Sequence, residues 1–184
     1  MNYSEYKELH KRLVDENKTT GGHTEPTYLE YTQLNWQRIK RWEKQAKFFD
    51  EEIDWLKEQK APTRWVILTE PWCGDAPPSL PLMAKMAEIH PNLELEILLR
   101  DENLELMNQF LTGGAQSIPK LIQYSGGTIS SWGPRPEGAA KLIHDYKMKF
   151  GKLDATAREQ LQQWYNKDKG RQIISELLVL LGRK

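Results

Sequence analysis

The chain has 184 residues, with 26 basic and 26 acidic side chains, so its formal net charge at pH 7 is zero. This balance removes the usual electrostatic argument for nucleic acid or an anionic membrane as a partner. The length suits one domain with additions and is sufficient to bury a core without disulfides or metal. The single cysteine excludes an intrachain disulfide.

No apolar run approaches the length of a membrane span, and the first residues lack the apolar stretch of a signal peptide. We therefore expect a cytoplasmic protein with no membrane partner, in which the cysteine is reduced at rest. The four histidines are not spaced as metal ligands with the cysteine or with one another. We expect no metal and no cofactor, and no feature of the sequence indicates the oligomeric state.

The N-terminal part, up to residue 61, is predicted to be helical. A first helix covers about residues 4–17, and Gly21-Gly22 separates it from a longer helix over about 26–60. Apolar residues of the longer helix recur at spacings of four and three and line one face, which we expect to pack on the rest of the molecule. They are Trp42, Ala46, Phe49, Ile53 and Leu56.

From residue 63 onward, predicted strands and helices alternate. The elements are a strand at 65–69, a helix at 73–89, a strand at 93–99 and a helix at 102–111. Such alternation predicts parallel strands joined by crossover helices.

The rest of the chain predicts a hairpin followed by helices. Strands at 120–124 and 128–132 are joined through Ser125-Gly126-Gly127, a hairpin signal, and a helix over about 136–150 follows. Gly151 marks the boundary between this helix and the C-terminal helices. Asp154 is the predicted N-cap of a helix to about residue 166, and a last helix covers about 170–181.

The cysteine, Cys73, stands between the predicted strand at 65–69 and the helix that follows it. A buried cysteine is commonly no more than a small apolar side chain. At a strand-to-helix turn, however, the partial positive charge of the helix N-terminus favours the thiolate. Cys73 is therefore the first candidate for a functional residue.

The residues around Cys73 resemble the active-site loop of the thioredoxin superfamily. Trp72-Cys73-Gly74 matches the start of the family's Trp-Cys-x-x-Cys pattern, whereas Asp75 and then Ala76 follow, so the second cysteine is missing. Pro81 follows at the place of the family's helix-kinking proline, and Ser117-Ile118-Pro119-Lys120 is similar to its cis-proline loop. The resemblance implies a thioredoxin-like α/β fold, a central mixed sheet flanked by helices, with added N-terminal and C-terminal helices.

The resemblance covers about residues 62–150. We therefore expect residues 1–61 to form an N-terminal helical extension and residues 62–150 a thioredoxin-like core. Residues 151–184 are expected to form a C-terminal helical extension packed on the core, as one compact domain overall.

In thioredoxins the first cysteine attacks a substrate disulfide and the second resolves the mixed disulfide. Ala76 cannot resolve it, and the apolar Ile67 stands where thioredoxins carry an acidic residue on the central strand. Both losses argue against an autonomous dithiol oxidoreductase. The resemblance instead implies monothiol exchange, in which Cys73 attacks and an external thiol resolves. Its partners would be a disulfide-containing protein or a low-molecular-weight thiol.

Two alternatives stay open. One is a non-catalytic interaction module that binds a peptide or protein partner in the groove beside Cys73 and Pro119. The other is a thiol peroxidase, in which Thr69 or another hydroxyl near Cys73 helps to activate peroxide. The ionisation of Cys73 discriminates exchange from binding, because only exchange needs an accessible thiolate.

The neighbours of Cys73 each have two possible roles. The carboxylate of Asp75 either opposes thiolate formation or only stabilises the first helical turn. Trp72 either shields the thiol or contacts a partner, or it only fills the core. We expect the bond between Ile118 and Pro119 to be cis, with Ile118 as a backbone pairing edge and Pro119 keeping metal away from the cysteine. The alternative for Pro119 is a purely structural role, as an ordinary proline at the edge of a strand.

Overall fold

The computed structural model describes all residues from Met1 to Lys184. The chain divides into two compact units, Met1–Pro134 and Arg135–Lys184, which are described separately. Helix α6 (Glu137–Phe150) belongs to the second unit. The domain limits expected from the sequence, at residues 61/62 and 150/151, stay predictions.

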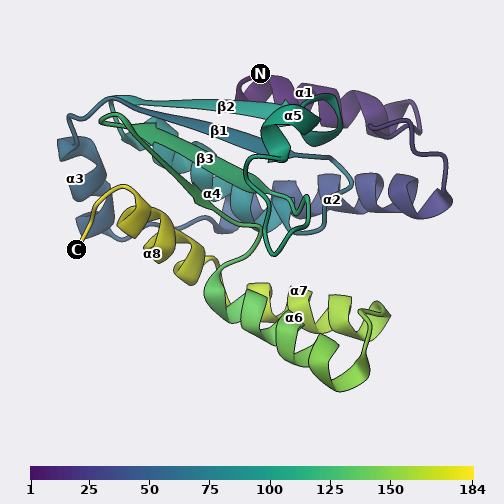
Figure 1. Cartoon of the computed structure of the whole chain (residues 1–184). Coiled ribbons are helices and arrows are strands. Elements are labelled where there is room, and N and C mark those ends of the chain that lie inside the picture. The colour runs from purple at the N-terminus through teal and green to yellow at the C-terminus, as the bar shows by residue number, and fades with distance from the viewer. The chain divides into compact units, whose positions relative to one another are not determined.

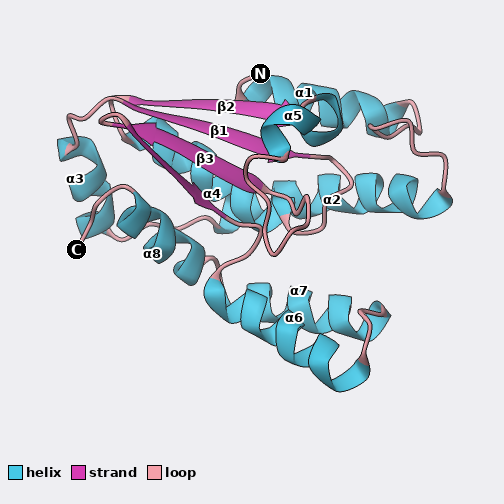
Figure 2. Cartoon of the chain, viewed as in Figure 1, coloured by secondary structure: helices cyan, strands magenta, loops and turns pink.

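The first unit is built on a four-stranded mixed sheet with the strand order β2-β1-β3-β4 (Figures 1 and 2). The central strand β1 is parallel to β2, with Ile67 opposite Ile97, and antiparallel to β3, which is antiparallel to β4. This arrangement confirms the mixed sheet expected from the sequence. The strands are β1 (Thr63–Thr69), β2 (Leu93–Leu99), β3 (Lys120–Ser125) and β4 (Thr128–Trp132).

Strand β1 is buried on both of its faces. Every residue of the strand except Arg64 is buried. A continuous apolar run is what a strand needs when neighbouring strands lie on both sides and packing covers both faces. The carboxyl end of this strand is therefore rigidly held, and the loop with Cys73 starts there.

The predicted hairpin between β3 and β4 is present. Gly126 and Gly127 form its turn with φ values of +56° and +78°. A two-residue turn of this kind requires positive φ at both positions, which glycine adopts without a steric penalty.

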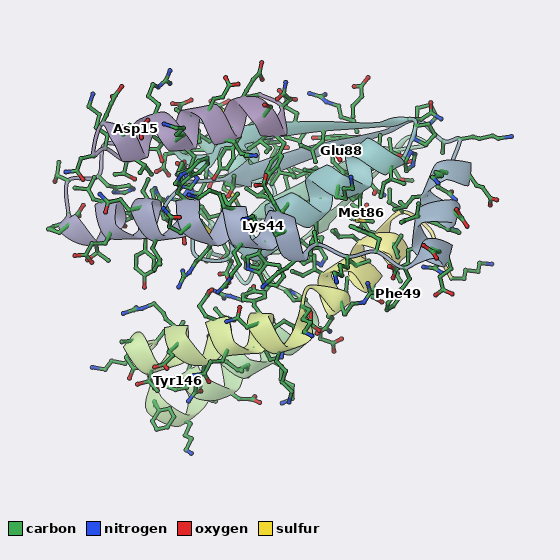
Figure 3. All side chains as sticks on the ribbon, turned by 180° about the vertical axis from the view of Figure 1, so that it is seen from behind. Asp15, Lys44, Phe49, Met86, Glu88 and Tyr146 are labelled. Atoms are coloured by element: carbon green, nitrogen blue, oxygen red, sulfur yellow. The ribbon has the colours of Figure 1, made fainter.

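Helix α4 (Ala76–Ile89) connects β1 to β2 and begins three residues later than the sequence predicts. Pro77 and Pro78 occupy its first turn, where a missing N–H group costs no intrahelical hydrogen bond. Cys73 consequently lies in the turn that precedes the helix, not in the helix itself. Most of α4 is buried, including Met86, labelled in Figure 3.

Three helices precede the sheet: α1 (Tyr3–Asp15), α2 (Pro26–Gln45) and α3 (Asp50–Glu58). Helix α1 packs on α2 and β2, and α4 packs on α2, α3 and β2. Helices α1, α2 and α4 lie in front of the sheet in the view of Figure 3, so they cover one of its faces.

The single helix predicted over residues 26–60 is wrong, because the chain leaves the helical conformation at Ala46. The Glu52 side chain accepts a hydrogen bond from the Phe49 N–H at 2.8 Å, which starts the new helix α3. Acidic residues at 50–52 favour a helix N-terminus at this point, where the helix dipole is positive. Phe49 lies between the two helices (Figure 3) and is 57% exposed, so it does not belong to the buried face predicted for it.

The helix predicted over residues 102–111 is also wrong in length. Only a short 3₁₀ turn, η1 (Arg100–Glu102), and one helical turn, α5 (Leu104–Met107), form there. Asn103 separates the two with a non-helical backbone (φ −133°, ψ 43°), and its side-chain amide donates to the Leu99 carbonyl at 2.8 Å.

The second unit consists of α6, α7 (Ala155–Asp168) and α8 (Arg171–Leu180), and α6 packs on α7. Asp154 is the N-cap of α7, as predicted, and its carboxylate accepts from the Ala157 N–H at 3.0 Å. The same oxygen accepts from the Tyr146 hydroxyl at 2.8 Å, which ties α6 to the start of α7. None of the helices in the chain combines the length and the apolar character that crossing a membrane requires.

Candidate functional site

The loop at the end of β1 holds Cys73 in a tight turn. The Cys73 N–H donates to the Glu70 carbonyl at 3.0 Å, and the Cys73 carbonyl accepts from the Ala76 N–H at 3.3 Å. Because β1 fixes one end of the loop and α4 fixes the other, the cysteine backbone has little freedom. Its side chain is buried, with 6% of its surface exposed.

The cis-proline loop meets this cysteine. The peptide bond between Ile118 and Pro119 is cis, as the resemblance predicts. The Cys73 thiol donates to the Ile118 carbonyl, with 3.2 Å between sulfur and oxygen. The structure therefore brings together two motifs that lie 45 residues apart in the chain.

A second cis peptide bond, between Gly133 and Pro134, lies beside the first. A Cβ atom at Gly133 would lie 2.3 Å from the Pro119 carbonyl oxygen, so only glycine fits there. The Lys120 ammonium donates to the Gly133 carbonyl at 3.1 Å and to the Thr112 hydroxyl at 2.5 Å. Burial lowers the pKa of Lys120, and these two oxygens hold its charged end at the cis-proline loop.

Trp72 lies in a cluster of ring systems. His23 and Tyr28 stack on each other with 3.9 Å between ring centres, and both meet the Trp72 ring edge-on. The Arg100 guanidinium lies 4.9 Å from the centre of the Trp72 ring, within the range of a cation–π contact. The residue before the cysteine is therefore half-buried by side chains from the N-terminal part and from η1.

The segment between α1 and α2 is bound to the same region through Glu70. The Glu70 carboxylate accepts from the Thr20 hydroxyl and from the Asp101 N–H, the latter at 2.9 Å. His23 Nε2 lies 3.4 Å from the Asp101 carboxylate. Burial raises the pKa of Glu70 above its usual value.

Two side chains of α2 reach the loop from the other side. The Asn35 amide donates to the carbonyls of Pro71 and Cys73, each at 3.0 Å, and accepts from Arg38 at 3.2 Å. Arg38 is close enough to Asp75 for their charges to interact, although burial is the larger effect and lowers the pKa of Arg38. Asp75 occupies the N-cap position of α4 without a side-chain capping hydrogen bond, and it is 5% exposed.

A tyrosine from helix α1 is buried near the site, and the central strand β1 carries no acidic residue. Tyr6 of α1 is fully buried, and burial together with the negative charges of ionised Cys73 and Glu70 holds its pKa well above the usual range. Ile67 is fully buried as well. The hydroxyl of Thr69, named for the peroxidase alternative, is buried at the end of β1.

The sequence singled out seven residues, which the structure places in the two facing loops and, for Ala76, at the start of α4: Trp72, Cys73, Gly74, Asp75, Ala76, Ile118 and Pro119. It did not identify Tyr6, His23, Tyr28, Asn35 or Arg100, because no local motif marks them. Only the packing of the N-terminal helices and η1 brings these residues to the cysteine loop. The chain has no group of three or more His, Cys, Asp or Glu side chains placed to hold a metal ion.

Comparison with known proteins agrees with this geometry. A thioredoxin family profile matches residues 21–147. An HIV epitope-scaffold crystal structure is 15% identical over 100% of both chains, with a TM-score of 0.59. A protein of unknown function from Pseudomonas aeruginosa is 17% identical over 96% of this chain and 99% of its own, with a TM-score of 0.52.

At these identities the two structures show a shared fold and nothing more. A search of curated proteins gives no match. The family profile covers well over half of the chain. The chain belongs to the thioredoxin family.

Proposed function

We propose that this protein carries out monothiol thiol–disulfide exchange through Cys73, with an external thiol as the resolving group. The observation that supports it most is the position of the thiol, whose sulfur lies 3.2 Å from the carbonyl oxygen of Ile118, the residue before Pro119. A disulfide that reaches the sulfur there would lie beside the cis-proline loop, next to the Ile118 carbonyl. The protein's partners would be a disulfide-containing protein or a low-molecular-weight thiol.

Disulfide exchange needs only one thiol from the protein when an external thiol performs the second step. Cys73 loses its proton to solvent, and the thiolate attacks one sulfur of the substrate disulfide. A bond forms between Cys73 and that sulfur, and the other sulfur leaves as a thiolate. A second, external thiolate then attacks the substrate sulfur of the mixed disulfide and releases Cys73 as a thiolate. The substrate ends as a disulfide with the external thiol.

A protein with this activity would work in a reducing compartment such as the cytoplasm. Resolution consumes an external thiol at every cycle, and reducing compartments keep such thiols available. Ala76, buried at the start of α4, offers no group that can replace the second thiol of a dithiol enzyme.

A specific observation supports the second candidate, a non-catalytic interaction module. Cys73 is only 6% exposed, and its thiol donates a hydrogen bond to the Ile118 carbonyl. A donating thiol is protonated, and the nearby carbonyl oxygen disfavours a thiolate. A partner strand would then bind the edge of the cis-proline loop without any reaction at sulfur.

Adduct formation with oxidised glutathione tests the proposal. The folded protein is incubated at mildly alkaline pH, and its intact mass is measured before and after addition of reduced glutathione. We expect one glutathione adduct on Cys73, stable until reduced glutathione is added, because the protein has no second thiol to expel it. Cys73→Ser is the control and should gain no mass. Folded wild-type protein that gains no mass contradicts exchange and favours the interaction module.

A further inference from the structure

Asn35 of α2 makes the most complete set of contacts with the cysteine loop. Its side chain is fully buried, and its Nδ2 donates to the Pro71 carbonyl and to the Cys73 carbonyl, each at 3.0 Å. Its Oδ1 accepts from the Arg38 guanidinium at 3.2 Å. A side-chain amide nitrogen has two N–H groups, so both donors are engaged in the loop.

The orientation of this amide follows from its neighbours. Exchanging its oxygen and nitrogen would set Oδ1 of Asn35 against two carbonyl oxygens and Nδ2 against the Arg38 guanidinium. Every contact would then join two acceptors or two donors. The amide therefore points both N–H groups at the loop, and Arg38 holds it in that direction.

We propose that Asn35 is a positioning residue for Cys73: its two hydrogen bonds fix the backbone of residues 71–73 so that the thiol faces the cis-proline loop. This inference rests on the proposed function, because it assigns to Asn35 the task of presenting the exchanging thiol. Asn35 acts on Cys73 through the backbone of the loop. We assign it no contact with the substrate disulfide.

The hydrogen bonds have an electrostatic consequence as well. The carbonyl oxygens of Pro71 and Cys73 carry partial negative charge, which opposes a negative charge on the nearby sulfur. Donors on these oxygens offset that charge; Asn35 supplies two of them, and the Ala76 N–H supplies a third. In a planar trans peptide the C=O and N–H groups point in opposite directions, so drawing the Cys73 carbonyl to α2 turns the Gly74 N–H away from α2.

A merely structural role for Asn35 would affect stability and leave thiol ionisation unchanged. Two measurements separate these roles: a pH titration of the thiolate by its ultraviolet absorbance, and thermal unfolding. The variants are Asn35→Leu and Asn35→Ala. Asn35→Leu fills the site with an apolar side chain and removes both donors, and Asn35→Ala removes both donors with the smallest side chain; neither adds a charge.

The matched control is Thr32→Val, on the same helix. Thr32 is fully buried like Asn35, but its hydroxyl bonds to Thr19 and to the Tyr28 carbonyl, away from the cysteine loop. Charged or titratable groups interact with the cysteine region from α1, from α2 and from the loop itself, and all stay in place in every variant. They are Tyr6, Arg38, Glu70 and Asp75.

Both Asn35 variants should raise the midpoint of Cys73 ionisation by about one pH unit, the size expected for lost hydrogen bonds to a region that carries charge. Thr32→Val should lower the unfolding temperature without moving the midpoint. If Asn35→Leu fails to fold, the Asn35→Ala titration decides.

A wild-type midpoint in the folded variant, or an equal shift in Thr32→Val, would overturn the positioning role. The titration needs no disulfide, so its outcome is separate from that of adduct formation. A wild-type protein that forms no adduct overturns the exchange itself. Equal midpoints in a reactive wild type and its Asn35 variant overturn only the role of Asn35.

Discussion

At the scale of single residues, the environment of Cys73 combines opposing charges. Asp75 lies two residues after the cysteine and is 5% exposed, so its carboxylate opposes a thiolate in a region that water screens poorly. Arg38 interacts with Asp75 from α2 and offsets part of that charge. The Asp75 side chain makes no capping hydrogen bond to α4.

Removing this carboxylate should make the thiol more acidic. We expect Asp75→Ala and Asp75→Asn to lower the apparent pKa of Cys73 by up to about one unit, because Arg38 then acts on the thiolate unopposed. The rate of Cys73 alkylation, measured against pH, gives this value. Asp75→Asn keeps the shape of the side chain and serves as the control for lost packing.

A raised or unchanged pKa in both variants would show that Asp75 acts on helix α4 and not on the thiol. A shift in Asp75→Ala alone would attribute the effect to packing.

At the scale of elements, a buried histidine joins the first two helices. His10 of α1 lies with its Nε2 at 2.8 Å from the Thr32 carbonyl of α2, so Nε2 carries the hydrogen. Its Nδ1 is buried without a hydrogen-bond partner, and the rings of Tyr6 and Trp36 both lie within 6 Å of the His10 ring, measured between ring centres. Burial lowers the pKa of His10 to about 4, because a charged ring would lose its hydration there.

This histidine makes the fold sensitive to acid. An unfolded chain binds a proton at His10 below pH 6.5, whereas the folded chain does so only below about pH 4. The stabilisation is therefore complete above pH 6.5 and is lost as the pH falls toward 4, with a total of about 3 kcal/mol. Urea unfolding should show this loss in the wild type and not in His10→Gln, whose amide can still donate to Thr32.

The difference between the two profiles is the quantity to compare, since every other titrating group is common to both proteins. His144→Gln, at an exposed position, is the matched control and should follow the wild type. Parallel profiles for the wild type and His10→Gln would show that His10 is hydrated in the folded state.

At the scale of the whole molecule, the features that depend on nearby residues could be predicted from the sequence, whereas those that depend on packing between distant segments could not. The strands, the hairpin turn at Gly126-Gly127 and the Asp154 cap were predictable, because apolar runs, glycines and capping residues act on their own neighbourhood. The break at Ala46 was missed, because the apolar spacing continues across it while the acidic start of α3 overrides it.

The same contrast between local motifs and long-range packing applies to the candidate site. Cys73 and Pro119 were found because short motifs mark them, and their order along the chain identified the fold family. Asn35 and Tyr28 carry no such mark. Asn35 meets the loop from 36 and 38 residues away, so its contribution depends on how α2 packs on α4.

The most direct test of monothiol exchange is turnover of a small disulfide. Reduced glutathione is supplied as the resolving thiol, and reduction of a glutathione mixed disulfide of a small thiol is followed with and without the protein. Monothiol exchange through Cys73 predicts catalysis by the wild type, none by Cys73→Ser, and no turnover when reduced glutathione is omitted. Equal rates with the wild type and with Cys73→Ser would contradict it.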